Sequence, residues 1–152
     1  AKYALVAMAG FFLLAGMSRS GYDSALALEN GSRAALMVAL ASAAGGILTP
    51  ALLPWLPGRV FSTKGALAGL LLGCLAAGLG WVPLAGIGGR LEAASWLLMV
   101  PAIAAFLAMN FTGASTYTSL SGVRKEMRAA VPAQIAASAV GFVLWVAARF
   151  LP

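Results

Sequence analysis

The sequence predicts an all-α membrane protein, a polytopic bundle of five transmembrane helices that forms one domain over residues 1–152. Two observations carry this prediction. Of the residues, 62% are hydrophobic and only 9% are charged, whereas soluble domains contain about 25% charged residues. In addition, long stretches without any charge alternate with short segments that hold the charged residues. A soluble fold has no means of covering so much apolar surface.

Each expected span follows from one of the uncharged stretches. A helix needs roughly 20 apolar residues to cross the hydrocarbon core, with about 17–25 as the working range. Four stretches reach that length, and the first, over residues 3–17, is slightly short. The spans are therefore expected at residues 2–18, 33–55, 65–87, 91–109 and 129–150.

Prolines and polar residues are expected to shape these spans. Pro50 should kink or end the second span, and Pro101 should bend the fourth. Pro132 lies near the start of the fifth span, where proline is tolerated, and residues 122–128 are expected to form a separate short interfacial helix before it. A polar loop around residues 23–31 is expected between the first two spans. The interior of the fifth span contains two polar residues, Gln134 and Ser138. They are four positions apart and therefore lie on one face of the helix.

The basic residues predict the orientation of the bundle. Five spans place the termini on opposite sides, and the side of the N-terminus carries six lysines and arginines against four on the other. Because short cytoplasmic loops carry the excess of lysine and arginine, we expect a multi-pass protein of the inner (cytoplasmic) membrane with its N-terminus in the cytoplasm and its C-terminus outside. The net charge of +6 is interpreted as contact with lipid headgroups, not with nucleic acid.

Glycines recur at every fourth position at the start of the third span. This spacing lines one face of a helix and lets another backbone approach closely. Packing within the bundle is the favoured interpretation, and a groove between two copies of the chain, in a homo-oligomer, stays open as the alternative. The residues concerned are Gly65, Gly69 and Gly73.

Metal and catalytic sites find little support in the sequence. Cys74 is the only cysteine and histidine is absent, so no haem, zinc or iron–sulfur site is expected. Cys74 is expected to be a small buried apolar residue; it is the one candidate metal ligand, without a second ligand near it in sequence. Without a base, no nucleophile–base pair is expected, and we predict no catalytic and no cofactor-binding residue.

Residues 110–128, between the last two spans, are called the hydroxyl-rich loop. Six of the sixteen serines and threonines and four of the fourteen charges of the chain lie here. These side chains either cap the ends of the two flanking spans or form a cytoplasmic docking surface for an anionic group or a partner domain. The candidate docking residues are Asn110, Thr112, Ser115, Thr116, Thr118, Ser119, Ser121, Arg124, Lys125 and Arg128.

Two segments of the chain resemble a known family. They are Leu-Pro-Gly-Arg-Val-Phe-Ser-Thr-Lys-Gly-Ala at residues 56–66 and Phe-Thr-Gly-Ala-Ser-Thr-Tyr-Thr-Ser-Leu-Ser-Gly-Val-Arg-Lys-Glu-Met-Arg at residues 111–128. Both are similar to the C-terminal transmembrane domain of the mercury-methylating corrinoid protein, a corrinoid-dependent methyltransferase. The resemblance implies a parent whose soluble cytoplasmic domain, expected upstream of Ala1, binds a corrinoid (cobalamin) and methylates Hg(II). It also implies a ferredoxin-like iron–sulfur protein that returns the corrinoid to its reduced state.

The resemblance further implies a role for this chain as the membrane anchor and docking domain of that parent. Its expected partners are the lipid bilayer, its own upstream corrinoid domain and the ferredoxin-like protein. The cobalt-ligating cysteine motif of the family has no counterpart here, since Cys74 does not match it, so this segment alone is not expected to be catalytic. The alternative is a transport or permeation module for the metal substrate or its methylated product.

Overall fold

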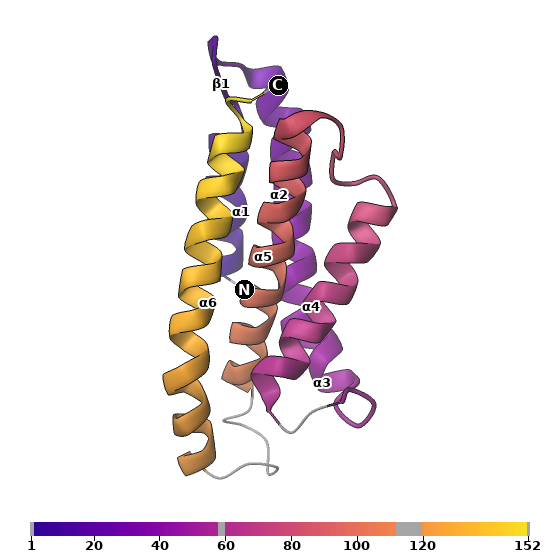
Figure 1. Cartoon of the computed structure of the whole chain (residues 1–152), viewed down its shortest axis with the longest axis vertical. Helices are drawn as coiled ribbons and strands as arrows, with labels where there is room; N and C mark the ends of the chain where they lie inside the picture. Colours follow the sequence, from indigo (N-terminus) through magenta and orange to yellow (C-terminus); the bar gives the residue numbers. More distant parts are fainter. Residues whose placement is uncertain (1, 58–59, 112–119, 152) are drawn as a thin grey trace.

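The computed structural model describes residues 2–57, 60–111 and 120–151, and it confirms an all-α bundle of five helices (Figure 1). Helix η1, a π-helix, and α3 continue α2 without a break, so these three elements form one rod. A short antiparallel hairpin of β1 (Met17–Ser18) and β2 (Gly21–Tyr22) joins α1 to this rod. The helices are α1 (Lys2–Leu14), α2 (Ser24–Ala43), η1 (Ala44–Leu48), α3 (Thr49–Ala51), α4 (Phe61–Gly78), α5 (Gly86–Phe111) and α6 (Leu120–Ala148).

Within the described residues, four helical segments are long and apolar enough to cross a membrane, and the chain is therefore a multi-pass membrane protein. They are Ser24–Ala51, Phe61–Gly78, Gly86–Asn110 and Arg124–Ala148. Helix α1 has 13 residues, which at 1.5 Å per residue is about 20 Å, short of the roughly 30 Å of the hydrocarbon core. Its first turn lies part-way along the bundle in Figure 1.

The α2 rod begins earlier than the expected second span, and the expected loop around residues 23–31 is wrong. Asp23 caps the helix, because its Oδ1 accepts a hydrogen bond of 2.8 Å from the Ala25 amide. One turn further, Glu29 forms an ion pair of 2.9 Å with Arg33. A cap and an i,i+4 pair stabilise a polar helix start, so the charged residues read as a loop belong to a helix.

Two of the prolines lie inside continuous helices. Helix α5 continues through Pro101, and α6 continues through Pro132. The separate interfacial helix expected at residues 122–128 is therefore wrong, since these residues belong to α6. Pro132 deprives the Arg128 carbonyl of its helical donor, and Arg128 itself is exposed. Pro50 lies at the end of its rod, as expected.

Helix α5 is the centre of the bundle, with contacts to the α2 rod, to α4 and to α6. The glycine face of α4 lies against it. A Cβ added to Gly65 would be 2.6 Å from the Ala108 Cβ, and one added to Gly69 would be 2.8 Å from the Ala104 Cβ. Gly73 is looser, at 3.9 Å from Val100. The glycine spacing thus serves close packing of two helices of the same chain.

Candidate functional site

The starts of α4 and α6 lie at the same end of the bundle, beside α3 and the last turn of α5 (Figure 1). We call this the motif end, because residues 60–66 and 120–128, the described helical parts of the two family-like segments, meet there. The Ser62 amide donates a hydrogen bond of 2.6 Å to Glu126 Oε1, across 64 residues of sequence. The carboxylate satisfies one of the free amides of the first turn of α4, where negative charge is favourable. The two segments therefore form one surface.

Further contacts shape the motif end. The Lys64 Nζ donates a hydrogen bond of 2.8 Å to the Leu53 carbonyl and so holds the turn that follows α3. A depression of about 520 Å³ lies between the starts of α4 and α6, with Val60, Ser62, Gly122, Lys125, Glu126, Ala129 and Ala130 around it. Lys125 lines this depression, and the side chains of Arg124, Lys125 and Arg128 are all exposed on the first turns of α6. The motif end is thus a hollowed and mainly basic surface.

The remaining residues predicted for docking are placed as follows. Asn110 is exposed in the last turn of α5. Its Nδ2 donates a hydrogen bond of 3.0 Å to the Phe106 carbonyl one turn earlier. For this residue the end-capping interpretation fits the contact. Outside the residues that the structure describes, or with side chains that it does not describe, lie Thr112, Ser115, Thr116, Thr118, Ser119 and Ser121.

Cys74 is exposed on α4, so its predicted burial is wrong. One residue turns a helix by about 100°, and because Gly69 and Gly73 face α5, the next position turns away. Among residues 2–57, 60–111 and 120–151, no three histidine, cysteine, aspartate or glutamate side chains are grouped to hold a metal ion.

A buried ion pair that the sequence did not predict lies at the opposite end of the bundle. Glu92 of α5 and Arg149, just after α6, form this pair with side chains 7% and 6% exposed. The Arg149 guanidinium also lies 4.9 Å from the centre of the Trp145 ring. Both charges lie at the ends of expected spans and 57 residues separate them, so the sequence did not predict that they pair.

An aromatic cluster surrounds this pair and ties α1 to α5 and α6. The Phe11 ring lies 4.9 Å from Trp145, 5.5 Å from Trp96 and 5.8 Å from Phe142, between ring centres. Trp96 and Trp145 are almost fully buried. We call this region, with the Glu92–Arg149 pair, the aromatic end. The tryptophans, at the ends of the expected spans, thus serve helix packing here.

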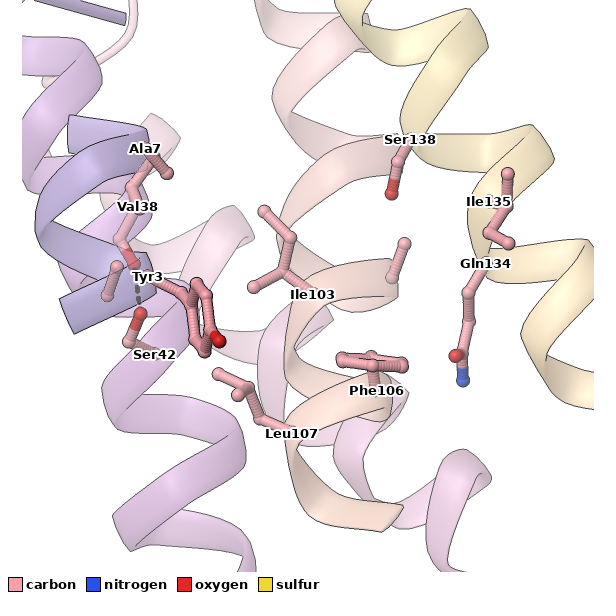
Figure 2. Close-up of a pocket in the computed structure, with 12 residues that line it drawn as sticks. Tyr3, Ala7, Val38, Ser42, Ile103, Phe106, Leu107, Gln134, Ile135 and Ser138 are labelled. Atoms are coloured by element: carbon pink, nitrogen blue, oxygen red, sulfur yellow. Dashed lines mark hydrogen bonds between the residues drawn. The ribbon is translucent and has the colours of Figure 1, made fainter. Parts of the chain in front are cut away.

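A cavity of about 430 Å³ lies between α1, α2, α5 and α6, beyond the aromatic cluster toward the motif end. Figure 2 shows Tyr3 of α1 on one side, Gln134 and Ser138 of α6 on the other, and Ile103 and Phe106 of α5 between them. Most of the lining is aliphatic or aromatic. The polar side chains that line the cavity are Tyr3, Ser42, Gln134 and Ser138.

Gln134 is the unusual member of this set. Its side chain is buried, at 9% exposure, and within the described part of the chain its Oε1 has no hydrogen-bond partner. A buried acceptor left unpaired costs about 1–3 kcal/mol. By contrast, the Ser42 hydroxyl donates a hydrogen bond of 2.8 Å to the Val38 carbonyl. The spacing of Gln134 and Ser138 indicated one side of this site in the sequence. The sequence did not indicate which other helices complete it.

The fold thus offers two places for a partner, the motif end and the cavity. The first is polar, basic and open, and the second is apolar and lies within the length of the spans. Comparison of the chain with protein-family models, with curated proteins and with solved structures found no match to any of them.

Proposed function

We propose that this chain is the membrane anchor and docking domain of a corrinoid protein that methylates inorganic mercury. In this proposal the motif end faces the cytoplasm, in an inner membrane, and a soluble domain upstream carries out the methyl transfer. The observation that carries the proposal is the hydrogen bond between the Ser62 amide and Glu126. It unites the two segments on which the family resemblance rests.

The position of these segments supports a docking role. Gly65, in the first family-like segment, packs α4 against α5, whereas the Ser62 amide, Lys125 and Glu126 lie at one end of the bundle, around the depression between α4 and α6. The depression between Ser62 and Lys125 offers a partner a shaped contact.

The charges of the two ends support the orientation. At the aromatic end, Arg33 pairs with Glu29 and Arg149 pairs with Glu92, so two of the four basic residues there are neutralised. At the motif end, Glu126 is bonded to a backbone amide, while Arg124 and Arg128 are exposed. Because short cytoplasmic loops carry the excess of lysine and arginine, the exposed Arg124, Lys125 and Arg128 favour a cytoplasmic motif end.

The docking role is tested in cells that make the gene product containing this chain, with Arg124, Lys125 and Arg128 all replaced by glutamine. We expect the protein to stay in the membrane fraction, while recovery of the ferredoxin-like partner and mercury methylation fall roughly tenfold, since exposed charges contribute a few tenths to 1 kcal/mol each. The matched control replaces Arg19 and Arg90, exposed at the opposite end, and should change neither quantity.

Deletion of residues 1–152 tests the anchoring role, and the remaining protein should then appear in the soluble fraction. Unchanged partner recovery and methylation in the triple variant would show that the motif end does not dock. Vesicles that contain this chain alone should take up no more Hg(II) than empty vesicles. Uptake above that background would favour the transport alternative over an anchor.

A further inference from the structure

We infer that the cavity between α1, α2, α5 and α6 binds a neutral lipid whose polar group is a hydroxyl. This inference does not depend on the proposed function, because it concerns a site within the membrane and not the motif end. It rests on the depth of the cavity, on the absence of charge in its lining and on the unpaired oxygen of Gln134.

The depth of the cavity indicates an occupant from the bilayer. Ser42, Phe106 and Gln134 lie inside the segments Ser24–Ala51, Gly86–Asn110 and Arg124–Ala148, which are long and apolar enough to span a membrane. Its volume of about 430 Å³ lies in the range of sites for small ligands, about 300–1,000 Å³. The lining includes no lysine, arginine, aspartate or glutamate, so an ion or a charged headgroup has no counter-charge there.

The hydrogen-bonding groups specify the polar part of the occupant. Among the residues that the structure describes, Gln134 Oε1 is an acceptor without a donor, and the surrounding hydrocarbon supplies none. Hydrocarbon chains and esters cannot donate a hydrogen bond, whereas a hydroxyl donates one and accepts another. A lipid alcohol donates to Gln134 and accepts from a hydroxyl of the lining, and Figure 2 shows the Tyr3 hydroxyl directed into the cavity.

The packing of α1 and α6 leaves a route of entry from the side. These helices meet through Phe11, Phe142 and Trp145 at the aromatic end. Further along, Tyr3 and Ile135 lie on opposite sides of the cavity (Figure 2), and both are largely exposed on the outer surface. A lipid can therefore enter between α1 and α6 without leaving the bilayer.

The test is photolabelling of the whole chain in phosphatidylcholine vesicles with two probes. One is a long-chain alcohol with a diazirine in the chain, and the other is its methyl ether, which accepts but does not donate a hydrogen bond. We expect the alcohol to label residues around Phe106 and Ile135 roughly threefold to tenfold more than the ether does. Unlabelled long-chain alcohol should compete, and unlabelled ether should not.

Two variants assign the site. Gln134→Leu should reduce alcohol labelling to the level of the ether, and it should fold, because it removes an unpaired buried polar atom. Val143→Ala, on the exposed face of the same helix, is the control and should leave labelling unchanged. Equal labelling of the cavity by both probes in the unaltered chain, or alcohol labelling that survives Gln134→Leu, would overturn the inference.

Discussion

The two ends of the bundle are held together by different chemistry. At the aromatic end, side chains pair with side chains, as Glu92 does with Arg149, in surroundings closed by Trp96 and Trp145. At the motif end, side chains hold the backbone, as Glu126 holds the Ser62 amide. At the aromatic end, the charged groups of the Glu92–Arg149 pair are therefore buried and paired. At the motif end, the contacts fix loops and helix starts while the basic side chains of α6 stay exposed, as a docking surface requires.

The largest expected effect is at the aromatic end. Glu92→Gln leaves Arg149 charged and buried without a partner, and removal of one member of a buried pair costs about 3–5 kcal/mol. The free energy of unfolding, measured in mixed detergent micelles, should fall by this amount. Glu29→Gln, at the exposed pair with Arg33, is the control, with an expected loss of about 0.5 kcal/mol or less. Equal losses at the two pairs would show that burial does not distinguish them.

The glycine face tests the packing that connects the two ends. In Gly69→Ala, the added Cβ lies 2.8 Å from Ala104 and Pro101 atoms, so α4 must move away from α5, at a cost of about 1–3 kcal/mol. Gly73→Ala adds the same atom 3.9 Å from Val100 and should be neutral or slightly stabilising. Similar unfolding free energies for the two variants would contradict the close approach of α4 to α5 at Gly69.

The motif end should respond more weakly and more locally. Glu126→Ala removes the acceptor for the Ser62 amide, and loss of such a cap costs about 1 kcal/mol. Hydrogen exchange at Ser62 should become faster, while exchange at the Trp96 amide stays the same. Arg124→Ala, an exposed neighbour on the same helix, provides the comparison. If it accelerates exchange at Ser62 as much as Glu126→Ala does, the carboxylate is not the group that protects this amide.

The smallest effect is expected away from both ends. Cys74 is exposed on α4, and exposed substitutions usually change stability by no more than about 0.5 kcal/mol. Cys74→Ala should therefore unfold like the unaltered chain, and a membrane-soluble maleimide should label Cys74 in the folded protein. A thiol that reacts only after unfolding would contradict its position on the outer face.

The sequence predicted more of the fold than of the candidate sites. Uncharged stretches revealed the helices, because hydrocarbon excludes charge, but they misplaced the start of the α2 rod, where Asp23 and Glu29 stabilise a polar turn. The glycine spacing indicated a close contact without naming α5 as the partner. Gln134 and Ser138 were visible as a polar pair on one face, yet the cavity exists because α1 and α6 diverge beyond Phe11.

The sequence by itself determined the membrane class, the helical architecture and the concentration of hydroxyls and basic charges between the last two spans. These properties follow from composition and from the length of hydrocarbon that a helix must cross. Tertiary structure alone decided that Glu92 meets Arg149, that Glu126 caps α4 and that Gln134 Oε1 has no partner in the described part of the chain. Each of these depends on residues that are distant in sequence and come together only when the helices pack. Periodicity along one helix indicates which face is buried, but not which helix packs against it.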